Sequence, residues 1–289
     1  MTTALAPARP EAAADRATLV ALAARETRRF AINPVFLFAV AATAWTTWGN
    51  QSSPVTEIDD LNWYPAILLG GFGMIATFGL TRSTRDSEPV IGVTPTTLPR
   101  RTAALCTVAT VPFLCGVLTL FTFLHLHPTG HQVYGAFSPS AQVAVLVGQI
   151  VVPSLGGPLL GVALGRWVRF PGAGFVALLV IFGWVNLATV PSLSHPDSAA
   201  ATALRQFAPF THFTYTDNGA AMTTWRGSPW FFLGWQLALC AIAVLVALLR
   251  GAEGRPRVRI IRALSIAVAA ALILLTLASL GGFTHSVTA

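Results

Sequence analysis

The chain has 289 residues, of which 54% are apolar and only 10% are charged, whereas soluble domains carry about 25% charged residues. A surface so poor in charge cannot face water, so the composition predicts a membrane protein. It excludes a disordered chain, a disulfide-stapled secreted module and a cytosolic enzyme. All 18 cations are arginine, which also excludes any P-loop or Schiff-base lysine.

Seven apolar runs without aspartate, glutamate or arginine approach or exceed the length of about 17–25 residues that a membrane-spanning helix needs. The predicted fold class is therefore an all-α integral membrane protein, a polytopic helix bundle. The predicted spans are 33–49, 63–81, 103–125, 142–165, 172–190, 230–249 and 264–282.

Residues 1–32 precede the first span, and 15–30 have the pattern of an amphipathic helix. Leu22 and Phe30 fall on one side of it, and Arg25, Arg28 and Arg29 on the other. Such a helix lies in the membrane interface with its arginines toward anionic headgroups. A frayed basic tail is the alternative.

Arginines accumulate in alternate connections, with 16 of the 18 on one predicted side and only Arg205 and Arg226 on the other. By the positive-inside rule, the N-terminus is cytoplasmic, and seven spans place the C-terminus outside the cell membrane. The basic pI therefore reflects membrane orientation, and no nucleic-acid partner is expected.

The cytoplasmic connection 82–101 is mixed in charge and has an apolar centre at Val90 and Ile91. A short amphipathic element here would lie parallel to the membrane and offer a docking surface to a soluble partner. The alternative is a solvated turn.

The fourth span carries a row of small residues, Gly157, Gly161 and Gly165, which share one helix face. Such a row lets another helix backbone approach closely. Pro153 and Pro158 lack backbone donors, so we expect a kink or break near 153–158. This region is either a hinge or a site of static close packing.

The external segment 191–229 is too polar to span the membrane, yet 206–215 gathers aromatic residues around Pro209. Backbone that dips into the outer leaflet must be covered by protein or water. We therefore expect this segment to cap a central interface.

Catalytic patterns are absent from the sequence, and the spans hold no obvious coupling site for a proton or cation gradient. His125, His127 and His131 form an HxHxxxH pattern on the external side that could hold copper or zinc. No acidic or cysteine ligand lies beside them, so surface histidines are the preferred interpretation.

Together these features resemble the membrane (permease) subunit of the type-2 ATP-binding-cassette (ABC) exporter family over residues 15–250. RETRRFAINP, from Arg25 to Pro34, is similar to the family's connecting helix. Glu88, Thr94-Pro95 and Arg100-Arg101 are similar to its coupling-helix pattern, although Pro89 and Gly92 depart from a regular helix. APFTHF, from Ala208 to Phe213, resembles its re-entrant external helices.

The resemblance implies a permease core at 33–250, followed by a basic loop and an extra span, 264–282, within 251–289. It assigns ATPase coupling to Arg85, Asp86, Glu88, Val90, Ile91, Thr94, Pro95 and Arg100. It assigns the external re-entrant segment to Pro209, Phe210, His212 and Phe213.

The implied function is export of an amphipathic or apolar substrate, such as a drug, an antibiotic or a lipid-like molecule, as in multidrug or antibiotic resistance. The chain itself would be a transport subunit and no enzyme, with no cofactor of its own. ATP and Mg²⁺ would bind to a separate cytoplasmic ATPase, and a second copy or a related permease would complete a dimer. The alternatives are an integral-membrane metal- or haem-binding protein that uses the external histidines, and a membrane scaffold or immunity protein.

Overall fold

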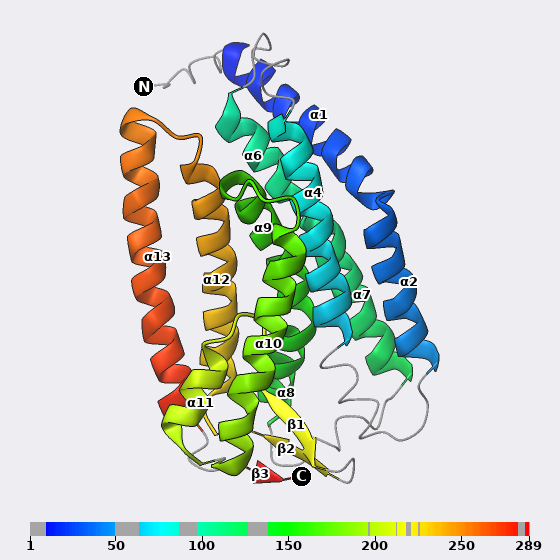
Figure 1. Cartoon of the computed structure of the whole chain (residues 1–289), viewed down its shortest axis with the longest axis vertical. Coiled ribbons are helices and arrows are strands. Elements are labelled where there is room, and N and C mark those ends of the chain that lie inside the picture. Colours follow the sequence, from blue (N-terminus) through cyan, green and yellow to red (C-terminus); the bar gives the residue numbers. More distant parts are fainter. Residues whose placement is uncertain are drawn as a thin grey trace, which may run out of the picture.

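The structure is a computed structural model, which describes residues 10–49, 64–86, 97–126, 138–195, 197–211, 213–217, 221–224, 226–282 and 287–288. Long helices lie side by side, and the N-terminal helix α1 (Pro10–Ala31) runs obliquely across one end of them (Figure 1).

Within these residues, six helical stretches are long and apolar enough to cross a membrane: Ala66–Asp86, Leu98–Leu126, Pro139–Trp167, Ala173–Pro191, Pro229–Leu249 and Gly254–Leu280. Helix α2 (Pro34–Gly49) has only 16 residues and does not qualify alone. Together with the end of α1, from which it is bent by 62°, it forms a candidate for the first of seven spans in chain order. The chain is a multi-pass helical membrane protein, as its composition predicts.

Several spans are composite. The second consists of the π-helix η1 (Ala66–Phe72) and α4 (Gly73–Asp86), and the third of α6 (Leu98–Thr107) and α7 (Thr110–Leu126). The fourth consists of α8 (Pro139–Leu146), the π-helix η3 (Val147–Val151) and α9 (Val152–Trp167). The remaining spans are α10 (Ala173–Ser194), α12 (Pro229–Leu249) and α13 (Gly254–Leu280).

The fourth span occupies the centre of the bundle. Of its most apolar stretch 78% is buried, against 17% for α13, which is therefore peripheral. Helix α9 packs on α4, η1, α7 and α12. Its glycines, alanines and prolines have little side chain to hold neighbours away, which explains why this helix can be surrounded on several sides.

A kink or break was expected near 153–158, but the helix is not interrupted there, because α9 continues through Pro158. The irregular turns lie just before it, in η3, where the hydrogen-bond spacing widens. Pro153 follows at the start of α9, where a missing backbone N–H is tolerated. The prolines therefore mark the place where the helix changes type.

The two ends of the bundle differ in charge. The basic end is where α1 lies and where α4, α9 and α12 end and α6, α10 and α13 begin (Figure 1). The opposite end carries a small sheet of β1 (Thr214–Asp217), β2 (Ala221–Thr224) and β3 (Val287–Thr288), and we call it the sheet end. Among the arginines in described positions, only Arg205 and Arg226 belong to the sheet end.

The sheet is antiparallel in the order β1-β2-β3. Thr214 pairs with Thr224 in the hairpin, and Thr223 pairs with Thr288 of the last strand. These strands were not expected from the sequence. They hold the chain after α13 against the connection between α10 and α12.

Candidate functional site

The predicted glycine row lies on the face of α9 that packs against η1 and α4. A Cβ added at Gly157 would lie 2.8 Å from Gly70 Cα, and one added at Gly161 would lie 3.0 Å from the Met74 carbonyl carbon. Both would overlap the carbonyl oxygens of those residues. The helices therefore touch backbone to backbone, and we call this contact the glycine seam.

A threonine hydroxyl also bridges the seam. Thr77 Oγ1 lies 2.9 Å from the Pro158 carbonyl oxygen across the seam and 2.9 Å from the Gly73 carbonyl oxygen in its own helix. With a single hydrogen to donate, it can exchange between the two acceptors. Nearer the basic end, a Cβ added at Gly165 would lie 2.6 Å from Thr81 Cβ, so this glycine also packs closely on α4.

The two π-helices lie in the sheet-end halves of spans two and four and contact each other. A π-turn places one extra residue in a helical turn, and such turns recur at functional sites. Both π-helices continue directly into the two helices of the seam. Any rearrangement of the seam therefore begins next to irregular turns that can absorb it.

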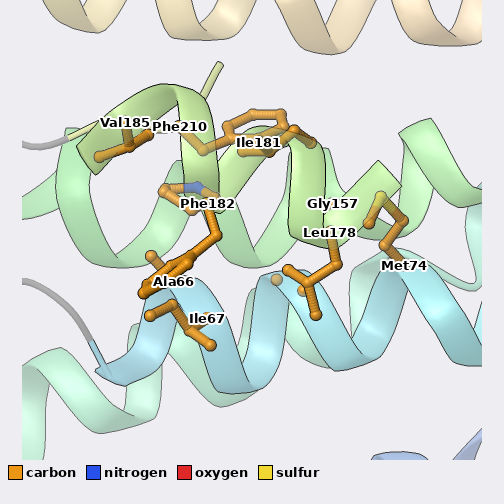
Figure 2. A pocket seen from close by; sticks show the side chains of 12 residues that line it. Ala66, Ile67, Met74, Gly157, Leu178, Ile181, Phe182, Val185 and Phe210 are labelled. Atoms are coloured by element: carbon orange, nitrogen blue, oxygen red, sulfur yellow. The ribbon is translucent and has the colours of Figure 1, made fainter. Parts of the chain in front are cut away.

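Beside the seam lies a cavity of about 60 Å³, enclosed by η1, α4, α9, α10 and Phe210 (Figure 2). Its walls carry no charged or polar side chain. The residues that line it are Ala66, Ile67, Gly70, Gly71, Met74, Pro153, Gly157, Leu178, Ile181, Phe182, Val185 and Phe210. An engineered cavity of about 150 Å³ holds benzene, so this space is smaller than one that accommodates a single aromatic ring.

Phe210 is held in an unusual backbone conformation at this cavity. Its φ of 61° is the only positive value at a non-glycine residue in the described part of the chain. A left-handed conformation at a bulky residue costs about 1–3 kcal/mol and persists only when the surroundings impose it. Here the buried Gln236 side chain accepts a hydrogen bond of 2.9 Å from the Phe210 backbone N–H.

The Phe210 ring is seated on the central helix. A Cβ at Gly156 would overlap its ring atoms, so only glycine at this position leaves room for it. Phe210 was predicted as part of the external re-entrant segment, but its conformation and its partner Gln236 were not. Gln236 could be anticipated only as an amide that bonds between helices.

The segment that precedes Phe210 caps the sheet end. Helix α11 (Ala199–Gln206) starts at Ser198, whose hydroxyl accepts a hydrogen bond of 3.4 Å from Ala201 N. It ends where the Gln206 carbonyl accepts the Trp235 indole N–H at 2.8 Å and the Gln206 side-chain carbonyl accepts Ser279 Oγ at 3.2 Å. The cap is thus tied to both α12 and α13.

Other predicted residues of this segment take different positions. Pro209 lies in the turn before Phe210, and Phe213 is fully buried, with its ring 5.5 Å from that of Phe232. Arg205 is also fully buried, in α11. His212 lies outside the described residues.

At the basic end, Arg85 joins the second span to the end of the fourth. Its guanidinium Nη1 donates to the carbonyl oxygens of Gly165 at 3.0 Å and Val168 at 2.9 Å. These are among the last carbonyls of α9, which have no partner within their own helix. The neighbouring Asp86 makes exposed ion pairs with Arg82 at 3.3 Å and with Arg85 at 3.6 Å.

The predicted interfacial helix is continuous and packs on α6, with smaller contacts to α2 and α4. Of its arginines, Arg25 and Arg28 are exposed. Arg29 pairs with Glu26 at 3.0 Å and donates to Ser83 Oγ at 3.4 Å. Phe30 is completely buried, with its ring 4.3 Å from that of Phe36 at the bend into α2.

Most of the segment to which docking was assigned lies outside the described residues. Arg100 lies in the first turn of α6, where its backbone N–H bonds to the Thr97 carbonyl at 3.1 Å. Glu88, Val90, Ile91, Thr94 and Pro95 lie outside the described residues.

Only the first histidine of the HxHxxxH pattern belongs to the described residues. His125 is exposed near the end of α7, whereas His127 and His131 lie outside the described residues. Within the described ranges, no three histidine, cysteine or acidic side chains gather as metal ligands would.

A second apolar groove, of about 200 Å³, lies between α2, η1 and α7. Four threonines, Thr43, Thr47, Thr119 and Thr122, line it beside Trp48, Leu118 and other apolar residues. Thr43 and Thr119 donate to carbonyls of their own helices at 2.8 and 2.9 Å. The groove therefore offers hydroxyl lone pairs within an otherwise apolar wall.

Comparison with protein-family models, with curated proteins and with solved structures found no match to this chain.

Proposed function

We propose that this chain is the membrane (permease) subunit of an ATP-driven exporter of the type-2 ABC class, which moves an amphipathic or apolar substrate out of the cell. A separate cytoplasmic subunit would bind ATP and Mg²⁺, and a second copy or a related permease would complete the substrate path. The observation that carries the proposal is the link from the start of the 87–96 connection to the central helix, made by Arg85.

The contacts around this connection suit a point of force transfer. The chain enters it from α4 and leaves it into α6, and α1 packs on both helices. Arg29 holds the end of α4 through Ser83, and Arg85 holds the end of α9 through two carbonyls. A partner that pushes on α1 or on the end of α4 would therefore act on α9 through the contacts of Arg29 and Arg85.

The glycine seam determines which movement such a push produces. Backbone contact fixes the distance between α9 and α4, yet it places few side chains in the way of sliding along the helix axis. Shear of packed helices by small steps is a recurrent mode of conformational change. The π-helices at the far end of the seam would absorb the shift in register.

The walls of the cavity and the groove support this substrate class. No charged or polar side chain lines the cavity at Phe210, and the groove at α2 and α7 adds only hydroxyls. Neither offers a charged group to pair with a strongly ionic substrate. An apolar or amphipathic molecule suits these walls, because burying an unpaired charge would be prohibitive.

The test is charge reversal at the proposed docking segment. Glu88→Arg should weaken co-purification of the ATPase subunit from native membranes and abolish substrate-stimulated ATP hydrolysis in nanodiscs, because a like charge at a contact repels. The matched control is Glu253→Arg, which reverses an exposed acid in the connection between α12 and α13 at the same end. We expect the control to retain the ATPase.

The proposal fails if no ATPase co-purifies with the wild-type protein, or if both variants behave like wild type. Elemental analysis of the same preparation provides an independent check. A stoichiometric metal would favour the histidine-based alternative.

The proposed orientation is tested separately by cysteine labelling in sealed membranes. A cysteine at Asp59 should react from outside the cell, and one at Glu253 only after the membrane is opened. Labelling of both from the same side would show that the positive-inside assignment is wrong.

A further inference from the structure

The outward face of α13 carries a row of three arginines at the basic end. Arg255, Arg259 and Arg262 are spaced by four and three residues, which places them within about 60° on one side of the helix. All three are exposed. In the described part of the chain, none of them takes part in an ion pair.

This row lies opposite the face by which α13 packs on the bundle. The buried residues Ala271, Ala278 and Ser279 define the packed face. By helical geometry they lie at least about 100° from the arginine row. The fourth arginine of this helix, Arg257, lies on the same side of the helix as the packed face. The row is thus directed away from α12, toward the surroundings of the protein.

Below the arginines, the same face continues as a stripe of exposed aliphatic residues. Ile266, Ile273 and Leu280 recur every seven residues and are exposed by 70%, 60% and 61%. Helix α13 has 27 residues, or about 40 Å, which matches a bilayer including its headgroups. Arg255 to Arg262 covers about 10 Å of that length, so the row lies at headgroup depth, Ile266 and Ile273 lie at acyl-chain depth, and Leu280 lies near the opposite headgroups.

The positive charge of the row also favours binding of an anion. The first turn of α13 contains no acidic residue, and Glu253 before it makes no side-chain cap. Of the row, only Arg255 lies in the first turn, where a cation faces the positive end of the helix dipole and is unfavourable unless negative charge lies nearby. Guanidinium groups bind phosphate oxygens in pairs, which makes a phosphate diester a suitable occupant.

We infer that the outward face of α13 is a binding site for an anionic phospholipid, with its phosphate among Arg255, Arg259 and Arg262 and one acyl chain along Ile266 and Ile273. A zwitterionic lipid fits less well, because its own cationic headgroup competes with the arginines for the phosphate. The inference does not depend on the proposed exporter function. It gives the seventh span a role at the edge of the bundle.

The test measures lipid binding to the purified full-length protein in neutral detergent. Short-chain phosphatidylglycerol is titrated and followed by native mass spectrometry and thermal stability, with phosphatidylcholine in parallel. The variant R259Q/R262Q should bind phosphatidylglycerol roughly 30-fold more weakly, on the basis of about 1 kcal/mol per arginine. The control R169Q/R257Q removes the same two charges from exposed positions at the same end and should stay within about threefold of wild type.

Each contrary result has a definite meaning. Equal weakening in both variants would reduce the effect to net charge and overturn the site. Equal binding of phosphatidylcholine by the wild type, or equal stabilisation by inorganic phosphate alone, would overturn the choice of an anionic lipid. A change of oligomeric state in R259Q/R262Q without any lipid would make this face a contact between copies of the chain. The variant R259K, which keeps the charge but loses the paired donors, should fall between wild type and R259Q/R262Q.

Discussion

Replacing Gly161 by alanine tests the glycine seam with the smallest possible change. The added Cβ would lie 3.0 Å from the Met74 carbonyl carbon and would overlap its oxygen, whereas ordinary contacts begin at 3.4 Å. The added Cβ would also overlap Thr77 Oγ1. The Met74 backbone cannot rotate away, so α9 and α4 must separate by at least about 0.4 Å. Overpacking of this kind costs about 1–3 kcal/mol.

Two further effects modify this cost. Separation lengthens the bond from Thr77 Oγ1 to the Pro158 carbonyl, which is worth about 0.6 kcal/mol in a membrane protein. Alanine in place of glycine also favours the helix by up to about 1 kcal/mol. We therefore expect a net destabilisation of about 1–3 kcal/mol.

The matched control is Gly79→Ala, in helix α4 itself. A Cβ at Gly79 would meet nothing within 4 Å, so only the helix preference remains, and we expect a gain of about 0.5–1 kcal/mol. Unfolding in mixed micelles titrated with an anionic detergent, followed by circular dichroism, measures both. If Gly161→Ala proves as stable as Gly79→Ala, the helices do not touch at the seam and the argument for shear has no basis.

Two further pairs of variants test the contacts at the ends of the bundle. Gln236→Leu leaves the partly buried Phe210 N–H without its acceptor and should destabilise the protein by about 1–3 kcal/mol. Asn186→Leu removes only a bond to a carbonyl of its own exposed helix face and should be nearly neutral. Equal effects in the same unfolding titration would mean that Phe210 is not held by Gln236. Arg85→Gln should cost about 1–3 kcal/mol and speed hydrogen exchange at the end of α9, whereas Arg82→Gln, which loses an exposed ion pair, should cost less than about 1 kcal/mol. Unchanged exchange in Arg85→Gln would remove the proposed link to the central helix.

The spans could be predicted from sequence because each is a charge-free run bounded by arginine or proline, and the bilayer fixes the length such a run must have. The position of the glycine row could also be predicted, because spacing by four residues places Gly157 and Gly161 on one face in any helix. These features depend on local sequence and the membrane alone.

The conformation of Phe210 could not be predicted, because nothing in the local sequence requires a positive φ at that residue. It results from a contact with Gln236, 26 residues further along the chain, and from the absence of a side chain at Gly156. The small sheet could not be predicted for the same reason, because β3 pairs with a hairpin more than 60 residues earlier in the chain. Such features depend on tertiary contacts between segments that have only weak preferences of their own.

The central helix α9 connects these contacts from one end of the bundle to the other. At the basic end Arg85 holds its last carbonyls, along its length the seam fixes its distance from α4, and near its start Gly156 supports the Phe210 ring. Phe210 itself is attached to α12 through Gln236 and does not belong to α9. A slide of α9 along α4 would therefore carry Gly156 out from under the ring, while Gln236 keeps the Phe210 backbone in place. The ring would lose the one position that a glycine leaves open for it, and the strain at Phe210 would no longer be compensated. Movement at the basic end and release of Phe210 at the cavity are thus coupled by geometry.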